Sequence, residues 1–258
     1  MTSAIDVSLG EVAASLVLIA VAIAVSRWRR AELESDITVA VVRSMLQLFA
    51  IGYVIQAIFD QESLWLVALL IVVMVVFGAY TARARATAVP GAFVPLLIAL
   101  ALAAAATIGL VLALGIFEPE PQYLVPVGGM VIGNAMTAAA VALNRLGDDV
   151  RESARQIEAT LALGATGSQA VDPFVRGSVR SGMIALVDST KTTGLIFFPG
   201  TMVGMLLAGA DPTDAVRLQL VLLWVLLGSV SISALTATGL AHRNFFTDAH
   251  QLKETPSQ

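Results

Sequence analysis

Two apolar stretches of the sequence carry polar side chains of the kind that line transport paths through membranes. The first contains Asn134 and Thr137, and the second contains Asp188 and Lys191 followed by Pro199-Gly200. Polar groups in hydrocarbon are costly, so each one is a candidate for contact with a polar or charged cargo. The candidate path residues are Gln47, Met130, Asn134, Met136, Thr137, Asp188, Lys191, Pro199, Gly200 and Met202.

The second stretch has the features of a helix that is broken inside the membrane. Asp188 and Lys191 are three residues apart, so they can pair on one helix face at the cytoplasmic entrance of a span. Pro199-Gly200 should break or kink the helix, and the freed carbonyl groups need protein or a water-filled cavity around them. A broken helix near the bilayer midplane is a feature of transport sites.

The first stretch permits two interpretations. Gly129 and Gly133 could let another helix approach closely, with Asn134 as an interhelical hydrogen-bonding group. Alternatively, Asn134, Met130 and Met136 face a translocation path. The residue types alone leave both interpretations open.

Residues suited to catalysis or to tight metal binding are sparse. The chain has no cysteine, and its two histidines, His242 and His250, lie in the C-terminal tail. An intramembrane hydrolase or lipid-modifying enzyme would need a base or metal ligands at membrane depth, which these histidines cannot supply. We therefore predict no catalytic residues and no enzymatic activity, and the sequence does not identify metal ligands.

The elements that must position the candidate residues are membrane-spanning helices. Of the 258 residues, 57% are hydrophobic and only 13% are charged, and the mean hydropathy is +0.85. A soluble domain would carry about twice that charged fraction. Apolar runs long enough for the bilayer predict an all-α polytopic protein with seven spans, at about 9–26, 38–59, 63–82, 92–117, 122–143, 192–210 and 215–241.

The basic residues predict the orientation, because they are retained on the cytoplasmic side. With the N-terminus outside and the C-terminus inside, all but Arg217 of the 15 Lys and Arg residues fall inside. The outer loops then carry acidic residues such as Asp60, Glu62, Glu118 and Glu120.

Residues 144–191 are predicted to form a cytoplasmic region of amphipathic helices within a single permease domain that covers residues 1–258. Val150, Ala154, Ile157 and Leu161 recur at helical spacing, and Gly164 and Gly167 interrupt this first helix. A second helix is expected to begin at Asp172-Pro173.

The first of these helices contains a segment with a recognisable spacing of acidic, small and glycine residues. The segment from Glu158 to Ala165 resembles the E-A-A-x-x-x-G motif by which permeases of ABC transporters contact their ATPase. Glu158 would meet basic groups of the ATPase, the small Ala159 and the neighbouring Leu161 would pack, and Gly164 would end the helix. The I-x-L-P part of the importer motif is missing, which argues against the importer families.

Longer strings in the C-terminal half resemble the FetB-like family of iron-export ABC permeases, whose plant relatives are involved in aluminium tolerance. These strings are Pro126 to Met136, Ile157 to Thr166, Asp188 to Ile196, Pro199 to Met202 and Arg243 to Leu252.

The resemblance implies a permease homodimer in the plasma (inner) membrane that exports iron or another metal ion, with a role in metal ion homeostasis. It also implies a separate ATPase subunit that binds ATP and Mg, so the chain itself would bind no cofactor. A nucleic-acid partner is not expected.

Other functions remain open at this point. A secondary carrier would need no ATPase, but the sequence shows no clear inverted repeat and no carboxylate deep in a predicted span. An ABC permease could carry a different cargo such as a nucleotide sugar. A scaffold that only tethers other proteins is a further alternative, although the kinked polar stretches argue against it.

Overall fold

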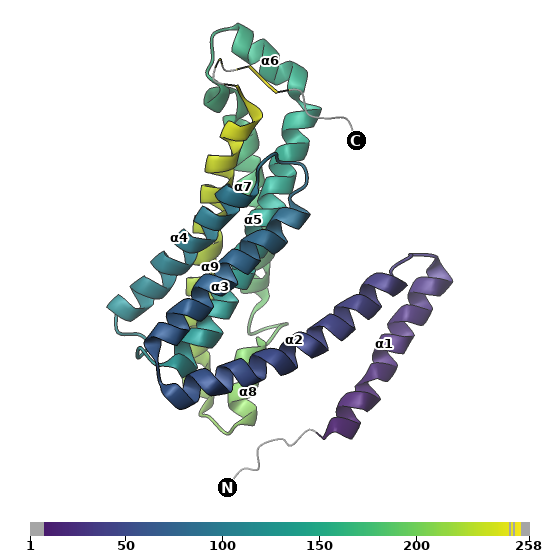
Figure 1. The fold of residues 1–258 in the computed structure, drawn as a ribbon, viewed down its shortest axis with the longest axis vertical. Helices are drawn as coiled ribbons and strands as arrows, with labels where there is room; N and C mark the ends of the chain where they lie inside the picture. The colour runs from purple at the N-terminus through teal and green to yellow at the C-terminus, as the bar shows by residue number, and fades with distance from the viewer. Residues whose placement is uncertain (1–7, 248, 250, 254–258) are drawn as a thin grey trace.

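The chain folds into a bundle of long helices, seen here in a computed structural model (Figure 1). The structure describes residues 8–247, 249 and 251–253, and within these residues every named element is a helix. This confirms the predicted all-α class. The helices are α1 (Leu9–Arg29), α2 (Glu34–Gln61), α3 (Leu64–Arg85), α4 (Phe93–Ala113), α5 (Pro121–Glu152), α6 (Ala154–Ala162), α7 (Gly167–Thr192), α8 (Gly200–Leu207), α9 (Pro212–Ala241) and the 3-10 helix η1 (His242–Phe245).

Six of the helices are long and apolar enough to cross a membrane: α1, α2, α3, α4, α5, and α9 together with η1. They agree with six of the seven predicted spans. The sixth predicted span, residues 192–210, is not one helix, because α7 ends at Thr192 and the 8-residue α8 begins only at Gly200. The predicted break is therefore present, and it is longer than a kink at Pro199-Gly200.

Five helices, α3, α4, α5, α7 and α9, form the packed bundle, with α5 and α9 side by side at its centre. Much of the interface is alanine: Ala79 of α3, Ala99 of α4, Ala135 of α5 and Ala234 of α9 are all fully buried. Small side chains let helix backbones approach closely. The resulting van der Waals packing attracts the helices to one another in lipid, which supplies no hydrophobic driving force.

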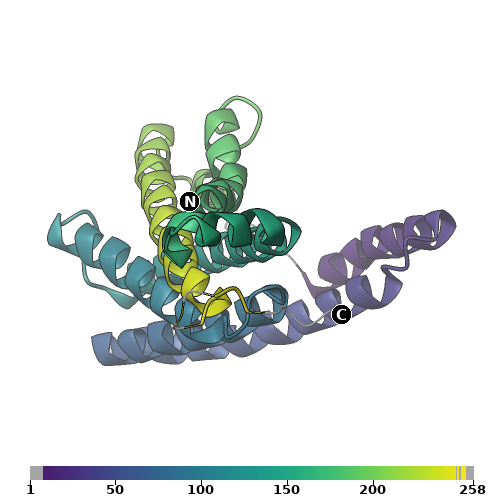
Figure 2. The same ribbon diagram turned by 90° about the horizontal axis from the view of Figure 1, so that it is seen from above.

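The α1–α2 hairpin stands apart from the bundle (Figure 2). In the most apolar 18-residue window of each helix, the buried share is 6% in α1 and 0% in α2, compared with 44% in α4 and 56% in α5. Among the described residues, α1 packs mainly on α2, and α2 contacts the bundle mainly through α5. The hairpin therefore exposes most of its apolar surface to lipid or to another protein.

Helix α7 departs from the prediction for residues 144–191. It begins at Gly167, because Thr166 and Gln169 form a capping box that satisfies the first N–H groups of the helix. Asp172 and Pro173, the predicted start, lie inside it.

The helix then runs back along α5 and α9 within the bundle. A Cβ on Gly182 would lie 2.6 Å from the Ala138 carbonyl oxygen of α5. Only the first part of residues 144–191 thus projects from the bundle, because the small faces of α7 and α5 fit together.

Helices α3, α5 and α9 all end on the side of the molecule that also carries α6 (Figure 1). We call this side the basic end, because it bears the arginines of the helix ends and of α6. The arginines at this end include Arg85, Arg151, Arg155 and Arg243.

Candidate transport site

The break between α7 and α8 exposes the backbone and several side chains. Gly194 adopts a positive φ of 86°, which lets the chain turn, and its N–H donates to the Phe197 carbonyl oxygen at 2.8 Å. Leu195 and Ile196 are exposed at the tip of the loop, whereas Pro199 is buried and precedes α8. An interrupted helix of this kind offers backbone groups and space that a continuous span would not.

Asp188 and Lys191 form an ion pair in the last turn of α7, as their spacing predicted. Lys191 Nζ lies 2.9 Å from Asp188 Oδ1, and both side chains are more than half exposed. Their position differs from the prediction. Since α7 contacts Ala138 of α5 through Gly182, Asp188 lies about 9 Å further along, away from the basic end. The pair therefore lies beside the middle of α5 rather than at the entrance of a span.

Hydroxyl groups next to this pair occupy the carbonyl groups of the last turn. Thr190 donates to the Leu186 carbonyl oxygen at 2.7 Å, and Thr193 donates to that of Ser189 at 2.8 Å. These bonds satisfy part of the backbone where the helix ends. The side chains of Asp188 and Lys191 stay available to the surface.

Helix α8 contacts α5 near the position along α5 where the Asp188–Lys191 pair lies. The Thr201 hydroxyl lies 3.9 Å from the Met130 sulfur, in the geometry of a weak hydrogen bond. The Asn134 side chain donates to the Met130 carbonyl oxygen of its own helix at 2.8 Å, and Thr137 donates to that of Gly133 at 3.1 Å. Among the described residues, the Asn134 side chain therefore makes no hydrogen bond to another helix.

A groove of about 710 Å³ lies between α2, α3 and α5. Gln47 and Met136, two of the candidate path residues, both line it. Gly129 and Gly133 line it too, and a Cβ added to either glycine would meet no atom of another described segment within 4 Å. These glycines therefore widen the groove, and they do not form the close helix contact that their spacing suggested.

The candidate path residues thus separate into two groups around α5. Gln47 and Met136 face the groove, whereas Met130 contacts α8. Asp188, Lys191, Pro199, Gly200 and Met202 belong to the α7–α8 break. The structure shows no contact between the ion pair and the groove among the residues it describes.

Helix α6 lies at the tip of the basic end (Figure 1). Its inner face carries the fully buried Ile157, and Glu158 and Ala159 are exposed. Gly164 has a φ of 93°, the Gly164 N–H donates to the Leu161 carbonyl oxygen, and the Ala165 N–H donates to that of Thr160. This is a Schellman ending, so the predicted helix stop at Gly164 is confirmed.

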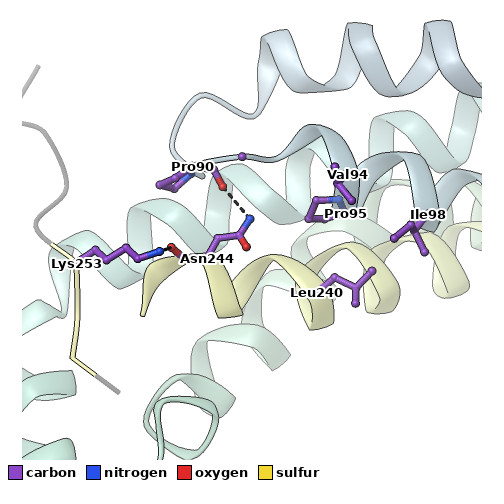
Figure 3. A pocket seen from close by; sticks show the side chains of 8 residues that line it. Pro90, Val94, Pro95, Ile98, Leu240, Asn244 and Lys253 are labelled. Atoms are coloured by element: carbon purple, nitrogen blue, oxygen red, sulfur yellow. Dashed lines mark hydrogen bonds between the residues drawn. The ribbon is translucent and has the colours of Figure 1, made fainter. Parts of the chain in front are cut away.

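The C-terminal tail fastens the basic end together (Figure 3). The Asn244 side chain donates to the Pro90 carbonyl oxygen at 2.9 Å, and Lys253 Nζ donates to the Asn244 carbonyl oxygen at 3.2 Å. The Phe246 ring lies against Gly167, where a Cβ would be 2.9 Å from it. The tail thereby joins α9 to the loop before α4 and to the start of α7.

A second cavity lies beside α6, with about 360 Å³ between Glu158 and Leu161 on one side and Gln251 and Leu252 on the other. The tail therefore forms part of the surface around the segment from Glu158 to Ala165, the predicted coupling segment. The FetB-like resemblance singled out both segments, but only the structure places them together.

Two polar residues of α9 were missed in the sequence. Gln219 is 6% exposed, and its Oε1 has no hydrogen-bond partner among the described residues. Ser233 donates across to the Ala135 carbonyl oxygen of α5 at 3.1 Å. A lone glutamine in the run Leu218 to Trp224 was the available signal, since polar residues in a span are costly.

No cluster of three or more His, Asp and Glu residues that could hold a metal ion occurs in the part of the chain that the structure describes. His242 is partly buried in η1 at the basic end, and His250 lies outside the described residues.

The chain matches the uncharacterised protein family UPF0014 over residues 9–246. It is 39% identical to protein ALUMINUM SENSITIVE 3 of Arabidopsis thaliana over 242 residues, covering 93% of this chain and 88% of the relative. It is 36% identical to the probable iron export permease protein FetB of Escherichia coli over 245 residues, covering 95% of both chains. It is also 38% identical to the membrane protein STAR2 of rice over 241 residues, covering 93% of this chain and 85% of the relative. No solved structure matches the chain significantly.

Proposed function

The chain belongs to the UPF0014 family of membrane proteins, and from that premise we propose that it is the permease subunit of an ABC transporter. In this proposal the chain is one permease domain that performs no chemistry. ATP and Mg are bound by a separate ATPase subunit, whose hydrolysis drives the membrane helices. The relative named as a probable iron export permease supports this role.

The observation that carries the proposal is the form of α6. It is a short helix at the tip of the basic end, anchored by the buried Ile157 and ended by a Schellman turn at Gly164. Its outer face presents Glu158, with Leu163 beyond it 89% exposed. A rigid helix with an acidic and an apolar contact point suits a soluble ATPase that must push on the membrane domain.

The arginines at the basic end, where α6 lies, support the proposed orientation. The basic end would face the cytoplasm, because it gathers the arginines of the helix ends. The N-terminus then lies outside and the C-terminal tail inside, in the plasma (inner) membrane.

For the cargo we propose iron or another metal ion, moved outward. This rests on the name of the Escherichia coli relative. The α7–α8 break, with Asp188, Lys191 and Met202, and the nearby Met130 and Asn134 of α5 would form the path. The exposed Asp188–Lys191 pair beside the middle of α5 is too polar for lipid, which favours a path between two copies of the chain.

The experiment that tests the coupling is an ATPase measurement. The chain would be coexpressed with the ATPase encoded nearest to it, and the purified complex would be compared with the ATPase alone in nanodiscs. We expect the permease to copurify with the ATPase and to raise its rate of hydrolysis. A secondary carrier would neither copurify with the ATPase nor change that rate.

A further inference from the structure

Arg43 is a charged residue inside a membrane-spanning helix. It lies nine residues after the start of α2, about 13 Å along the helix axis. The side chain is exposed, and none of the five ion pairs among the described residues includes it. An arginine within the predicted span 38–59 is costly unless its side chain reaches the interface or unless water or a counter-charge accompanies it. The chain itself supplies no close carboxylate partner from its described residues.

Arg43 lines the groove between α2, α3 and α5, and Arg85 lines the same groove from the last turn of α3. Arg85 likewise takes part in none of those ion pairs. Asp36, in the first turn of α2, is the one acidic residue of the lining. The formal charge of the groove is therefore positive, and a bare divalent cation would be repelled from it.

The remaining walls are mostly apolar, with Val39 of α2, Val73 and Phe77 of α3 and Ile132 of α5 among them. The groove thus combines two guanidinium groups with an apolar surface. Guanidinium groups present planar, paired N–H donors that match phosphate oxygens, and basic pockets between membrane helices bind lipid headgroups. A volume of about 710 Å³ is large enough for a phosphate and a sizeable attached group.

We propose that this groove binds a phosphate-bearing anion, with Arg43 and Arg85 holding the phosphate and the apolar walls holding the attached group. The ligand is either the headgroup of an acidic phospholipid, entering from the leaflet at the basic end, or a water-soluble phosphate ester. The site needs only the groove and its arginines. It does not depend on the ATPase or on the cargo proposed above.

The test uses the full-length chain purified in a neutral detergent. Equilibrium binding is measured for three probes: radiolabelled phosphatidic acid in mixed micelles, inorganic pyrophosphate, and Fe²⁺ alone. We expect saturable binding of at least one phosphate probe. The variants Arg43→Gln and Arg85→Gln should weaken it about tenfold or more, because each loses charge-assisted hydrogen bonds. Arg83→Gln, two residues from Arg85 but outside the groove lining, is the matched control and should bind as the unaltered chain does.

The probes also distinguish the two sources of phosphate. Binding of phosphatidic acid that pyrophosphate does not displace indicates a lipid site, and binding of pyrophosphate indicates a soluble ligand. Lack of saturable binding of both phosphate probes would overturn the proposal. So would binding that is equal in the two groove variants and the unaltered chain. Arg85 ends its helix, so Arg85→Gln keeps the test decisive if Arg43→Gln does not fold.

Discussion

The five-helix bundle and the α1–α2 hairpin are both apolar, but they use that composition in opposite ways. The bundle is built on alanine and glycine at helix crossings, and about half of the most apolar window of α4 and α5 is buried. The hairpin displays large side chains such as Leu18, Leu46 and Leu48 on its surface and buries almost none of its own window. Close packing therefore stabilises the bundle, whereas α2 of the hairpin packs loosely enough to line an open groove with α3 and α5.

The largest expected effect comes from adding a methyl group to the bundle. A Cβ on Gly147 would lie 2.4 Å from the Ala88 Cβ and 2.7 Å from its carbonyl oxygen. We expect Gly147→Ala to lower the free energy of unfolding by about 3 kcal/mol, because the backbone of the α3–α4 loop must move. The measurement is thermal unfolding in detergent.

Gly52→Ala in the hairpin is the matched control. Apart from its own stretch of helix, no atom of the described residues lies within 4 Å of its added Cβ, so this change should leave stability unchanged or raise it by up to about 1 kcal/mol. Equal losses in the two variants would mean that the hairpin packs within the chain as tightly as the bundle does.

The next effect concerns function and leaves the bundle intact. We expect Glu158→Lys in α6 to lower ATP-driven transport by about tenfold or more, since it reverses the charge offered to the ATPase. Transport and membrane insertion would both be measured, and insertion should be normal because Glu158 is exposed. Glu152→Lys, the same change at the exposed end of α5, serves as control. Unimpaired transport by the Glu158→Lys variant would remove α6 from the coupling.

A smaller effect should follow from loosening the tail at the basic end. Asn244→Ala removes the hydrogen bond to the Pro90 carbonyl oxygen, and we expect a loss of about 1 kcal/mol in thermal stability. Arg243→Ala, on an exposed neighbour without a side-chain hydrogen bond or ion pair among the described residues, should change stability by less than half of that. If both variants unfold at the temperature of the unaltered chain, the tail does not fasten the bundle.

The smallest effect tests an interhelical hydrogen bond in the bundle. Ser233→Ala removes a hydroxyl that donates to the Ala135 carbonyl oxygen of α5 and to the Val230 carbonyl oxygen of its own helix, and loss of the interhelical bond should cost about 0.6 kcal/mol. Ser231→Ala is the control, because among the described residues the Ser231 hydroxyl donates only to the Leu227 carbonyl oxygen of its own helix. A lower unfolding temperature for Ser231→Ala than for Ser233→Ala would contradict the assigned role of Ser233.

The sequence was a good guide to the helices and a poorer guide to their contacts. Hydropathy located six long helices, and Gly164 marked the end of α6 as predicted. The seventh expected span differs in form, because the run 192–210 is apolar enough for a span but contains Gly194 and Pro199, which end one helix and precede another. Hydropathy measures composition and does not register such backbone breaks.

The candidate site shows the same limit. Spacing predicted the Asp188–Lys191 pair correctly, but its depth depends on how α7 lies against α5. Gly129 and Gly133 have the spacing of a packing motif, yet they open onto the groove, and Gly182 makes the close contact instead. Which glycine meets another helix is decided by tertiary packing, and the periodicity of one segment cannot reveal it.

The central claim is that the chain is an ATP-driven exporter subunit, and transport in inside-out vesicles tests it most directly. The chain would be reconstituted with its ATPase, and uptake of radiolabelled iron would be followed with ATP and with an ATPase-inactive partner. The account predicts uptake that requires hydrolysis and is lost in the Glu158→Lys variant. Uptake that proceeds equally with the inactive ATPase would contradict it and would indicate a secondary carrier.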